Sequence, residues 1–168
     1  MKTGVRILLV EDDEYDARLV RAAWGTLAFE ETVVAVTDGQ QALDYLYRRG
    51  LFADRPPFQP SVVLLDLNMP RVDGFEVLKK VKNDPLLRAI PIVVLTSSNQ
   101  PRDLMRAYEL GANGYVLKAL DFAAYTEALR TLKRYWLEVN EIPPASGGPR
   151  PGLDAEPPSA PGVDRTPG

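Results

Sequence analysis

The stretch Val62-Val63-Leu64-Leu65-Asp66 is a run of four apolar residues that ends at an acid. A run this short and this rich in valine and leucine is typical of a strand that is buried on both faces of a parallel sheet. Similar apolar runs lie before and after it, at residues 5–10, 33–36, 92–95 and 115–117. The chain therefore contains five candidate strands.

Segments with helical periodicity separate and follow these strands, at residues 14–28, 39–49, 74–83, 101–110 and 121–140. Strict alternation of strands and helices predicts an open, doubly wound α/β sheet with helices on both faces. Pro101 fits a first helical turn, Gly111 a helix C-cap and Asp121 a helix N-cap. The prolines within residues 50–60 predict a loop before the third strand.

Composition limits the chemistry that this chain can perform. Its 168 residues, 45% of them hydrophobic, are enough for one well-buried core. Cysteine and histidine are both absent, which excludes disulfides, zinc sites built on these residues and a Ser-His-Asp triad. The net charge of −3 and the scattered Lys and Arg give no reason to expect nucleic acid as a direct ligand. Carboxylates, hydroxyls and lysines remain.

The two ends of the sequence differ in character. The apolar run at residues 5–10 is too short for a signal peptide or a membrane span, so we expect a cytoplasmic protein with no membrane partner. Residues 143–168 include eight prolines and five glycines but no aromatic residue, a composition that predicts a disordered tail. One folded domain is accordingly expected over residues 1–142.

Polar residues stand where four of the predicted strands end. Singly, each has an ordinary structural explanation, because acids cap helices and lysines lie along surfaces. In a doubly wound sheet, however, ligands bind beyond the carboxyl ends of the strands. The group as a whole therefore predicts a functional site at that edge. Its members are Glu11, Asp12 and Asp13 after the first strand, Asp66 after the third, Thr96 at the fourth and Lys118 after the fifth.

The chemistry of this group follows from its charges. Crowded carboxylates raise one another's pKa unless a cation intervenes, and oxygen-only ligands suit Mg²⁺. An aspartate beside such a metal can attack a phosphoryl group in line, while a lysine and a hydroxyl hold the charge that develops. Asp66, at the end of the central strand, is the candidate phosphoryl acceptor.

Five strings of residues add a family resemblance. They are Val10-Glu11-Asp12-Asp13, Leu65-Asp66-Leu67-Asn68-Met69-Pro70, Asp73-Gly74, Leu95-Thr96-Ser97-Ser98 and Gly114-Tyr115-Val116-Leu117-Lys118. With these strings in this order, the chain resembles the receiver domains of two-component response regulators. The resemblance implies a flavodoxin-like sheet of five parallel strands in the order 2-1-3-4-5, flanked by five helices. It also implies a phosphorelay switch rather than an enzyme.

The resemblance implies a metal site at the acids. Glu11 and Asp12 are expected to hold Mg²⁺ together with Asp66, the phosphorylated residue. Asn68 is expected to contribute its backbone carbonyl. Asp13 lies one place beyond the acidic pair and is better explained as the N-terminal capping acid of the following helix.

The resemblance also implies how the switch works. Phosphorylation adds negative charge and three acceptor oxygens; Lys118 is expected to pair with these oxygens and Thr96 to move inward to bond one of them. Tyr115 stands where the family has an aromatic that enters the vacated space, although an aromatic on a half-exposed edge strand is also ordinary. Asn68 and Ser98 occupy positions that tune the phosphoryl lifetime in this family.

One residue departs from the family pattern. Lys118 is followed by Ala119, where receivers usually have a proline that sets a cis peptide. A cis peptide before alanine would cost about 2.5–4 kcal/mol, so a trans peptide or a strained loop is expected. The departure predicts a slower switch, because it affects how Lys118 reaches the site.

The last helix and its neighbours are the expected output surface, with no DNA-binding helix-turn-helix expected after the receiver. One apolar stripe is expected to pack on the sheet: Phe122, Tyr125, Leu129, Leu132, Trp136 and Val139. A second apolar surface, expected to form a homodimer across the fourth helix, fifth strand and fifth helix, includes Leu104, Met105, Tyr108, Tyr135 and Leu137. Ordinary scattered surface hydrophobics are the alternative.

The extended last helix and the loop before the third strand most resemble the small stand-alone regulators paired with phytochrome-type histidine kinases. The implied partner is a sensor histidine kinase of the light-sensing kind, although a regulator of any other sensor kinase would have the same sequence features. Two other functions compete. An aspartyl-nucleophile phosphohydrolase needs a second acid at Asn68 and a cap domain. A degenerate receiver would act as a phosphorylation-independent binding module, which the intact acids, Thr96 and Lys118 disfavour and Ala119 leaves open.

Overall fold

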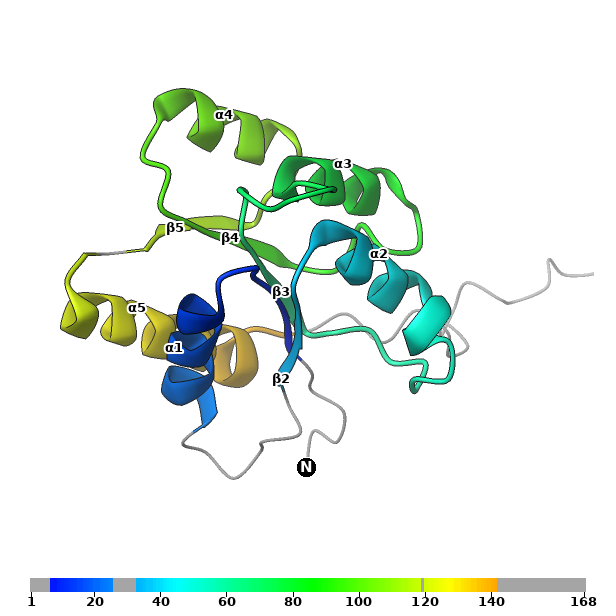
Figure 1. Cartoon of the computed structure of the whole chain (residues 1–168), viewed down its shortest axis with the longest axis horizontal. Coiled ribbons are helices and arrows are strands. Elements are labelled where there is room, and N and C mark those ends of the chain that lie inside the picture. Colours follow the sequence, from blue (N-terminus) through cyan, green and yellow to red (C-terminus); the bar gives the residue numbers. More distant parts are fainter. Residues whose placement is uncertain (1–6, 26–32, 119, 142–168) are drawn as a thin grey trace, which may run out of the picture.

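The computed structural model describes residues 7–25, 33–118 and 120–141. Strands and helices alternate along the chain (Figure 1). The strands are β1 (Ile7–Val10), β2 (Val33–Val36), β3 (Val62–Leu65), β4 (Ile92–Thr96) and β5 (Gly114–Leu117). The α-helices are α1 (Glu14–Gly25), α2 (Gly39–Tyr47), α3 (Gly74–Asn83), α4 (Pro101–Glu109) and α5 (Phe122–Arg134). The predicted tail at 143–168 lies outside the described residues.

The five strands form one parallel sheet in the order β2-β1-β3-β4-β5, which confirms the predicted fold class. The central strands β1 and β3 pair in register, from Ile7 opposite Val62 to Val10 opposite Leu65. Because the two strands end together, the residues that follow Val10 and Leu65 emerge side by side at the same edge of the sheet.

Helices cover both faces of the sheet (Figure 1). One face packs against α1 and α5, and the other against α2, α3 and α4. Alternate residues of β1 serve the two cores: Leu8 and Val10 point to one, Ile7 and Leu9 to the other. A strand buried on both faces needs an unbroken apolar sequence, which is why the short apolar runs marked the strands.

Most predicted helix boundaries are confirmed. Pro101 begins α4, Gly111 follows that helix with a φ of 100°, and Asp121 caps α5 by accepting a hydrogen bond from the Ala123 amide. The second helix ends at Tyr47, close to its predicted end near residue 49. Arg48 adopts a left-handed φ of 55°, which turns the chain out of the helix.

The proline-rich loop before β3 is organised by one side chain. The Arg55 guanidinium donates hydrogen bonds to the carbonyl oxygens of Tyr45 and Leu46, in the last turn of α2, and to that of Phe58. Free carbonyls at a helix C-terminus attract cations. Arg55 therefore ties the loop to the end of α2, after a single 3₁₀ turn at Gly50–Phe52.

The C-terminal part of the last helix differs from the predicted stripe. Tyr125, Leu129 and Trp136 are buried as predicted, but Phe122 and Val139 are exposed. Tyr135–Val139 wind as a π-helical turn, closed by a hydrogen bond from the Asn140 amide to the Tyr135 carbonyl. The wider turn rotates the side chains, so Leu137, predicted to lie off the stripe, packs against the core.

Candidate functional site

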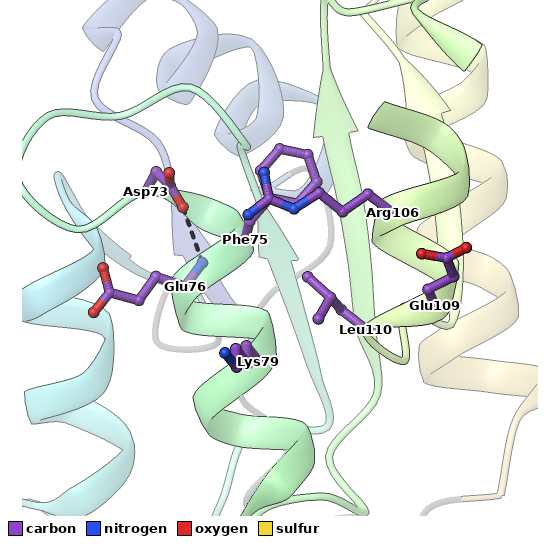
Figure 2. Close-up of a pocket in the computed structure, with 7 residues that line it drawn as sticks. All are labelled: Asp73, Phe75, Glu76, Lys79, Arg106, Glu109 and Leu110. Carbon is purple, nitrogen blue, oxygen red and sulfur yellow. Dashed lines mark hydrogen bonds between the residues drawn. The ribbon is translucent and has the colours of Figure 1, made fainter. Parts of the chain in front are cut away.

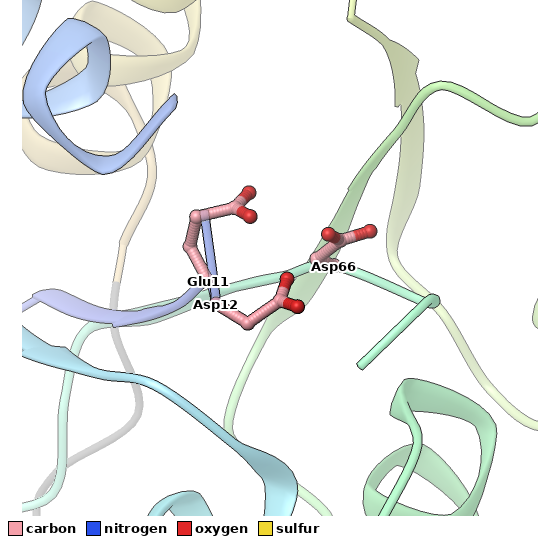
Figure 3. A group of neighbouring side chains, drawn as sticks. All are labelled: Glu11, Asp12 and Asp66. Atoms are coloured by element: carbon pink, nitrogen blue, oxygen red, sulfur yellow. The ribbon is translucent and has the colours of Figure 1, made fainter. Parts of the chain in front are cut away.

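The carboxyl ends of β1 and β3 bring three carboxylates together (Figure 3). The Glu11 amide donates to the Val36 carbonyl at 3.0 Å, which extends the sheet by one residue and buries the Glu11 side chain. The Asp66 amide donates to the Val10 carbonyl at 3.0 Å, so this side chain is buried beside it. Asp12 completes the group from an exposed position.

These carboxylates can hold a divalent cation. Glu11, Asp12 and Asp66 each offer an oxygen, and the three oxygens lie within 4.8 Å of one another. The pKa of Glu11 is raised from 4.5 to about 7, mainly by burial; the hydrogen bond from Lys118 opposes this rise and the charge of Asp66 adds to it. A cation would replace the proton that burial favours, so the residues present fit a hard divalent metal.

Lys118 faces these acids from the end of β5. Its amide donates to the Thr96 carbonyl at 2.8 Å, and its ammonium lies 2.6 Å from Glu11 Oε2 and 3.3 Å from Asp66 Oδ2. Burial alone would lower the pKa of Lys118, but hydrogen bonds to Asp16 and Glu11 hold it above its usual value. The ammonium is therefore charged and already directed at Asp66.

Thr96 and Ser98 form the adjoining wall of the site. Thr96 is the last residue of β4 and is fully buried, and its hydroxyl oxygen accepts a hydrogen bond from the Ser98 amide at 3.1 Å. The Ser98 hydroxyl donates to Asp103 Oδ2 at 2.6 Å. In this state, therefore, the Ser98 side chain is held by α4.

The Tyr115 side chain links β5 to the loop after β4. Its hydroxyl donates to the Ser98 carbonyl at 2.9 Å, and its half-buried ring packs against the core shared with α2, α3 and α4. The hydroxyl and the ring together attach Tyr115 to the segment that runs from Thr96 to α4.

The loop between β3 and α3 is tied down at both ends. The Asn68 amide donates to Asp66 Oδ1 at 3.2 Å, while the residue itself is exposed. Arg71, with a φ of 65°, forms an ion pair with Asp38, a buried acid that also caps α2. The loop is thus anchored to the carboxylate of Asp66 and to a neighbouring helix.

Two features of this region were not predicted from the sequence: the contact between Asp16 and Lys118, and the environment of the Tyr125 hydroxyl, since Tyr125 was predicted only as part of the apolar stripe of the last helix. Asp16, in the first turn of α1, accepts a hydrogen bond from the Lys118 ammonium at 2.8 Å. The Tyr125 hydroxyl is buried and has no hydrogen-bond partner among the described residues. The prediction for Asp13 is confirmed, because its carboxylate accepts a hydrogen bond from the Asp16 amide at 2.9 Å. Ala119 lies outside the described residues, so the geometry of the Lys118–Ala119 peptide stays a prediction.

A groove of about 540 Å³ lies between α3 and α4 (Figure 2). The Arg106 guanidinium covers the Phe75 ring at 4.2 Å from its centroid. The other lining side chains carry charges of both signs or are apolar: Asp73, Glu76, Lys79, Glu109 and Leu110. None of the three clustered carboxylates lines this groove, so it is separate from the candidate metal site.

Comparison with known proteins agrees with the geometry of the site. The sequence model described as "Response regulator receiver domain" matches residues 7–130. The chain belongs to this family. It is 37% identical over 139 residues to the response regulator Rcp1 of Synechocystis sp., covering 83% of this chain and 93% of that protein.

Solved receiver structures are similar over nearly their whole length. The phosphorylated cyanobacterial phytochrome response regulator RcpA aligns with a TM-score of 0.78 at 36% identity, covering 83% of this chain and 99% of that one. The Mn²⁺-bound form of Rcp1 gives the same TM-score, identity and coverage. The receiver fold and a phosphorelay role are therefore established for this chain, and the phosphorylation-independent module is not favoured.

The described part of this receiver offers no membrane span, since none of its helices has both the length and the apolar character required to cross a bilayer.

Proposed function

We propose that Asp66 accepts a phosphoryl group from the phosphohistidine of a sensor kinase, with Mg²⁺ held by Glu11, Asp12, Asp66 and the backbone carbonyl of Asn68. The observation that carries this proposal is the convergence of three carboxylate oxygens within 4.8 Å, with the Lys118 ammonium 3.3 Å from Asp66. A buried carboxylate that lies beside both a lysine ammonium and a metal-binding group of acids is suited to nucleophilic attack on phosphorus.

In the proposed transfer, an Asp66 carboxylate oxygen attacks phosphorus, the P–N bond to the histidine breaks, and the imidazole keeps the electron pair. When bound, Mg²⁺ neutralises charge on the phosphoryl oxygens. Lys118 supplies a second positive charge at those oxygens, and the buried Thr96 hydroxyl donates to one of them. Burial of Asp66 and Thr96 excludes water, which strengthens both interactions.

The proposed switch runs from Thr96 to α4. When the Thr96 hydroxyl turns to a phosphoryl oxygen, it gives up the hydrogen bond that it accepts from the Ser98 amide. Because the Tyr115 hydroxyl is bonded to the Ser98 carbonyl, movement of this segment draws Tyr115 with it. Asn68 and Ser98 are proposed to tune the phosphoryl lifetime by controlling the approach of water to the acyl phosphate.

We further propose a phytochrome-type histidine kinase as the partner, in the cytoplasm. The support is the likeness to a phytochrome response regulator at a TM-score of 0.78. This receiver is proposed to have no enzymatic activity beyond its own phosphorylation and dephosphorylation, and no nucleic-acid ligand. A chain with 23 acidic and 20 basic residues offers no excess of positive charge to a phosphate backbone.

The proposed homodimer uses α4, β5 and the start of α5. Large apolar side chains are exposed there, which is the composition of a protein-binding surface. They are Leu104, Met105 and Tyr108 on α4, Leu117 on β5, and Leu120 and Phe122 before and at the start of α5. Tyr135, further along, is also exposed, but Leu137 is part-buried in the core and is not part of the surface.

Intact mass spectrometry tests the phosphoryl transfer. The parent chain, incubated with acetyl phosphate and Mg²⁺, should gain the mass of one phosphoryl group; Asp66→Asn and an EDTA-treated parent should gain none. No gain on the parent, or an equal gain on Asp66→Asn, would refute Asp66 as the acceptor. Substituting a phytochrome-type kinase and ATP for acetyl phosphate tests the partner separately.

Sedimentation velocity tests the dimer. With beryllofluoride and Mg²⁺ the parent should sediment as a dimer, and Met105→Glu, which places a charge in the exposed surface, should remain a monomer. Leu86→Glu is the matched control, because Leu86 is equally exposed but lies on the loop after α3. A parent protein that stays monomeric both with and without beryllofluoride would contradict the proposed dimer.

A further inference from the structure

Among the described residues, Asp16 is the one hydrogen-bond partner of the Lys118 ammonium that lies outside the candidate metal site. The Lys118 ammonium has three hydrogens, and three carboxylates receive them: Glu11 at 2.6 Å, Asp16 at 2.8 Å and Asp66 at 3.3 Å. Glu11 and Asp66 belong to the group that can hold a metal, and Asp16 does not.

A bound cation would change these three contacts unequally. Metal ions draw on the lone pairs of the carboxylates that ligate them, so the acceptors at Glu11 and Asp66 would be shared between metal and ammonium. The Asp16 carboxylate would keep its lone pairs for Lys118. Of the three contacts, the one with Asp16 is therefore independent of whether the metal site is filled.

The position of Asp16 is fixed by the helix that carries it. Its amide donates to Asp13 Oδ1 at 2.9 Å, which closes the N-terminal cap of α1. The helix in turn is packed against α5 in the core on that face of the sheet. The Asp16 carboxylate is carried by the capped first turn of α1. Its hydrogen bond with Lys118 is charge-assisted, because both groups are ionised, and it is partly shielded from water, because both side chains are partly buried.

We propose that Asp16 is a positioning residue for Lys118: it holds the ammonium beside Asp66 while the metal and the phosphoryl group take over the other two contacts. This proposal rests on the proposed phosphoryl transfer to Asp66. Asp16 touches neither metal nor phosphoryl group and acts through Lys118, whose own backbone leaves the sheet immediately after β5.

The first test is the rate of phosphorylation by acetyl phosphate at saturating Mg²⁺, followed by intact mass. Asp16→Ala should be slower than the parent by about tenfold, the factor that corresponds to about 1.4 kcal/mol. Asp16→Asn, which keeps a neutral acceptor, should fall between them. Glu14→Ala is the matched control, because Glu14 is an acid in the same helical turn but pairs with Arg18 at the surface. The rate of this variant should stay within about twofold of the parent rate.

A double-mutant cycle separates positioning from a structural role. In a Lys118→Ala background, Asp16→Ala should cause no further loss of rate, because the group that it positions is gone. An Asp16→Ala rate within about twofold of the parent would overturn the proposal. The proposal would also be overturned if Asp16→Ala slowed phosphorylation in the Lys118→Ala background as much as in the parent, because the effect would then come from the fold of α1.

A second readout needs no phosphorylation. In the chain labelled with ¹⁵N-lysine and saturated with Mg²⁺, where the metal competes for Glu11 and Asp66, the Lys118 ammonium should give a slowly exchanging NMR signal that Asp16→Ala abolishes and Glu14→Ala preserves. If the parent gains no phosphoryl group, the proposed function fails, and this signal alone decides whether Asp16 holds Lys118. An ammonium signal that is unchanged in Asp16→Ala would overturn the proposal in either case.

Discussion

Gly74 lies directly against the backbone of Asp66. Its amide donates to the Leu67 carbonyl at 3.0 Å, and a Cβ atom on Gly74 would clash with the Asp66 carbonyl oxygen and lie 2.7 Å from the Leu67 Cα. Helix α3 therefore begins in contact with the strand end that carries the proposed phosphoryl acceptor.

We expect Gly74→Ala both to destabilise the protein and to slow phosphorylation. The added methyl group can be accommodated only if the start of α3 and the Asp66–Leu67 backbone move apart, which displaces Asp66. The loss of unfolding free energy should be about 1–3 kcal/mol, measured by urea denaturation. Gly114→Ala is the control, since its Cβ would meet the Val93 side chain at an ordinary 3.5 Å. A Gly74→Ala protein as stable as the control would contradict the observed packing.

The ion pair between Arg71 and Asp38 predicts a second stability effect. Arg71→Ala would leave the buried Asp38 carboxylate with the Gln41 amide as its one hydrogen-bond partner among the described residues, and should cost about 1–2 kcal/mol of unfolding free energy. Arg71→Gly should cost less than Arg71→Ala, because glycine relieves the left-handed φ of 65°. Thermal unfolding of both variants checks the order; an Arg71→Ala protein more stable than Arg71→Gly would contradict it.

The raised pKa of Glu11 predicts a pH dependence for the metal-free chain. Its folded-state pKa of about 7 lies above the ordinary 4.5, so between these values the folded state binds more protons than the unfolded state. The free energy of unfolding should therefore fall as pH rises from about 5 to 7, by about 1–3 kcal/mol.

Urea denaturation in EDTA at pH 5 and pH 7 measures this slope. Excess Mg²⁺ should reduce it, because the metal replaces the proton, and Glu11→Gln should flatten it in EDTA. An equal slope in the parent and in Glu11→Gln would show that another group is responsible.

The contacts of Lys82 predict that it stabilises the fold at the amino ends of the strands, away from the acids. Its ammonium donates to the carbonyls of Arg88 and Ile90 and to the Asn113 side chain, joining the loops that lead into β4 and β5. Lys82→Met should lower the unfolding free energy by about 2–3 kcal/mol, because three hydrogen bonds from a charged donor are lost, although Asn113 Oδ1 keeps the one that it accepts from the Ile92 amide. Lys80→Met, which removes a surface pair with Glu76, should change it by less than about 0.5 kcal/mol. Similar losses in the two variants would contradict this role.

The acids, Thr96 and Lys118 could be placed from the sequence because parallel strands end at one edge, so a strand boundary alone locates the residue that follows it. Asp16 could not be placed in this way. Which side chain of the first turn of α1 meets Lys118 depends on the rotation of that helix against α5, and the periodicity of α1 does not fix this rotation.

The end of α5 shows the same limit in another form. Leu137 and Val139 exchange their expected environments because the helix widens at Tyr135–Val139. A regular period of 3.6 residues contains no information about such a π turn. Likewise, the Arg71–Asp38 pair joins residues separated by 33 positions, and only the packed structure brings them together.

The order of strands in the sheet has an evolutionary consequence. The acids follow the central strands β1 and β3, whereas the exposed apolar side chains lie on α4 and β5, at one margin of the sheet. Substitutions that redesign the margin need not disturb the acids. A lineage built on this plan can exchange one partner for another while it inherits its phosphoryl chemistry unchanged.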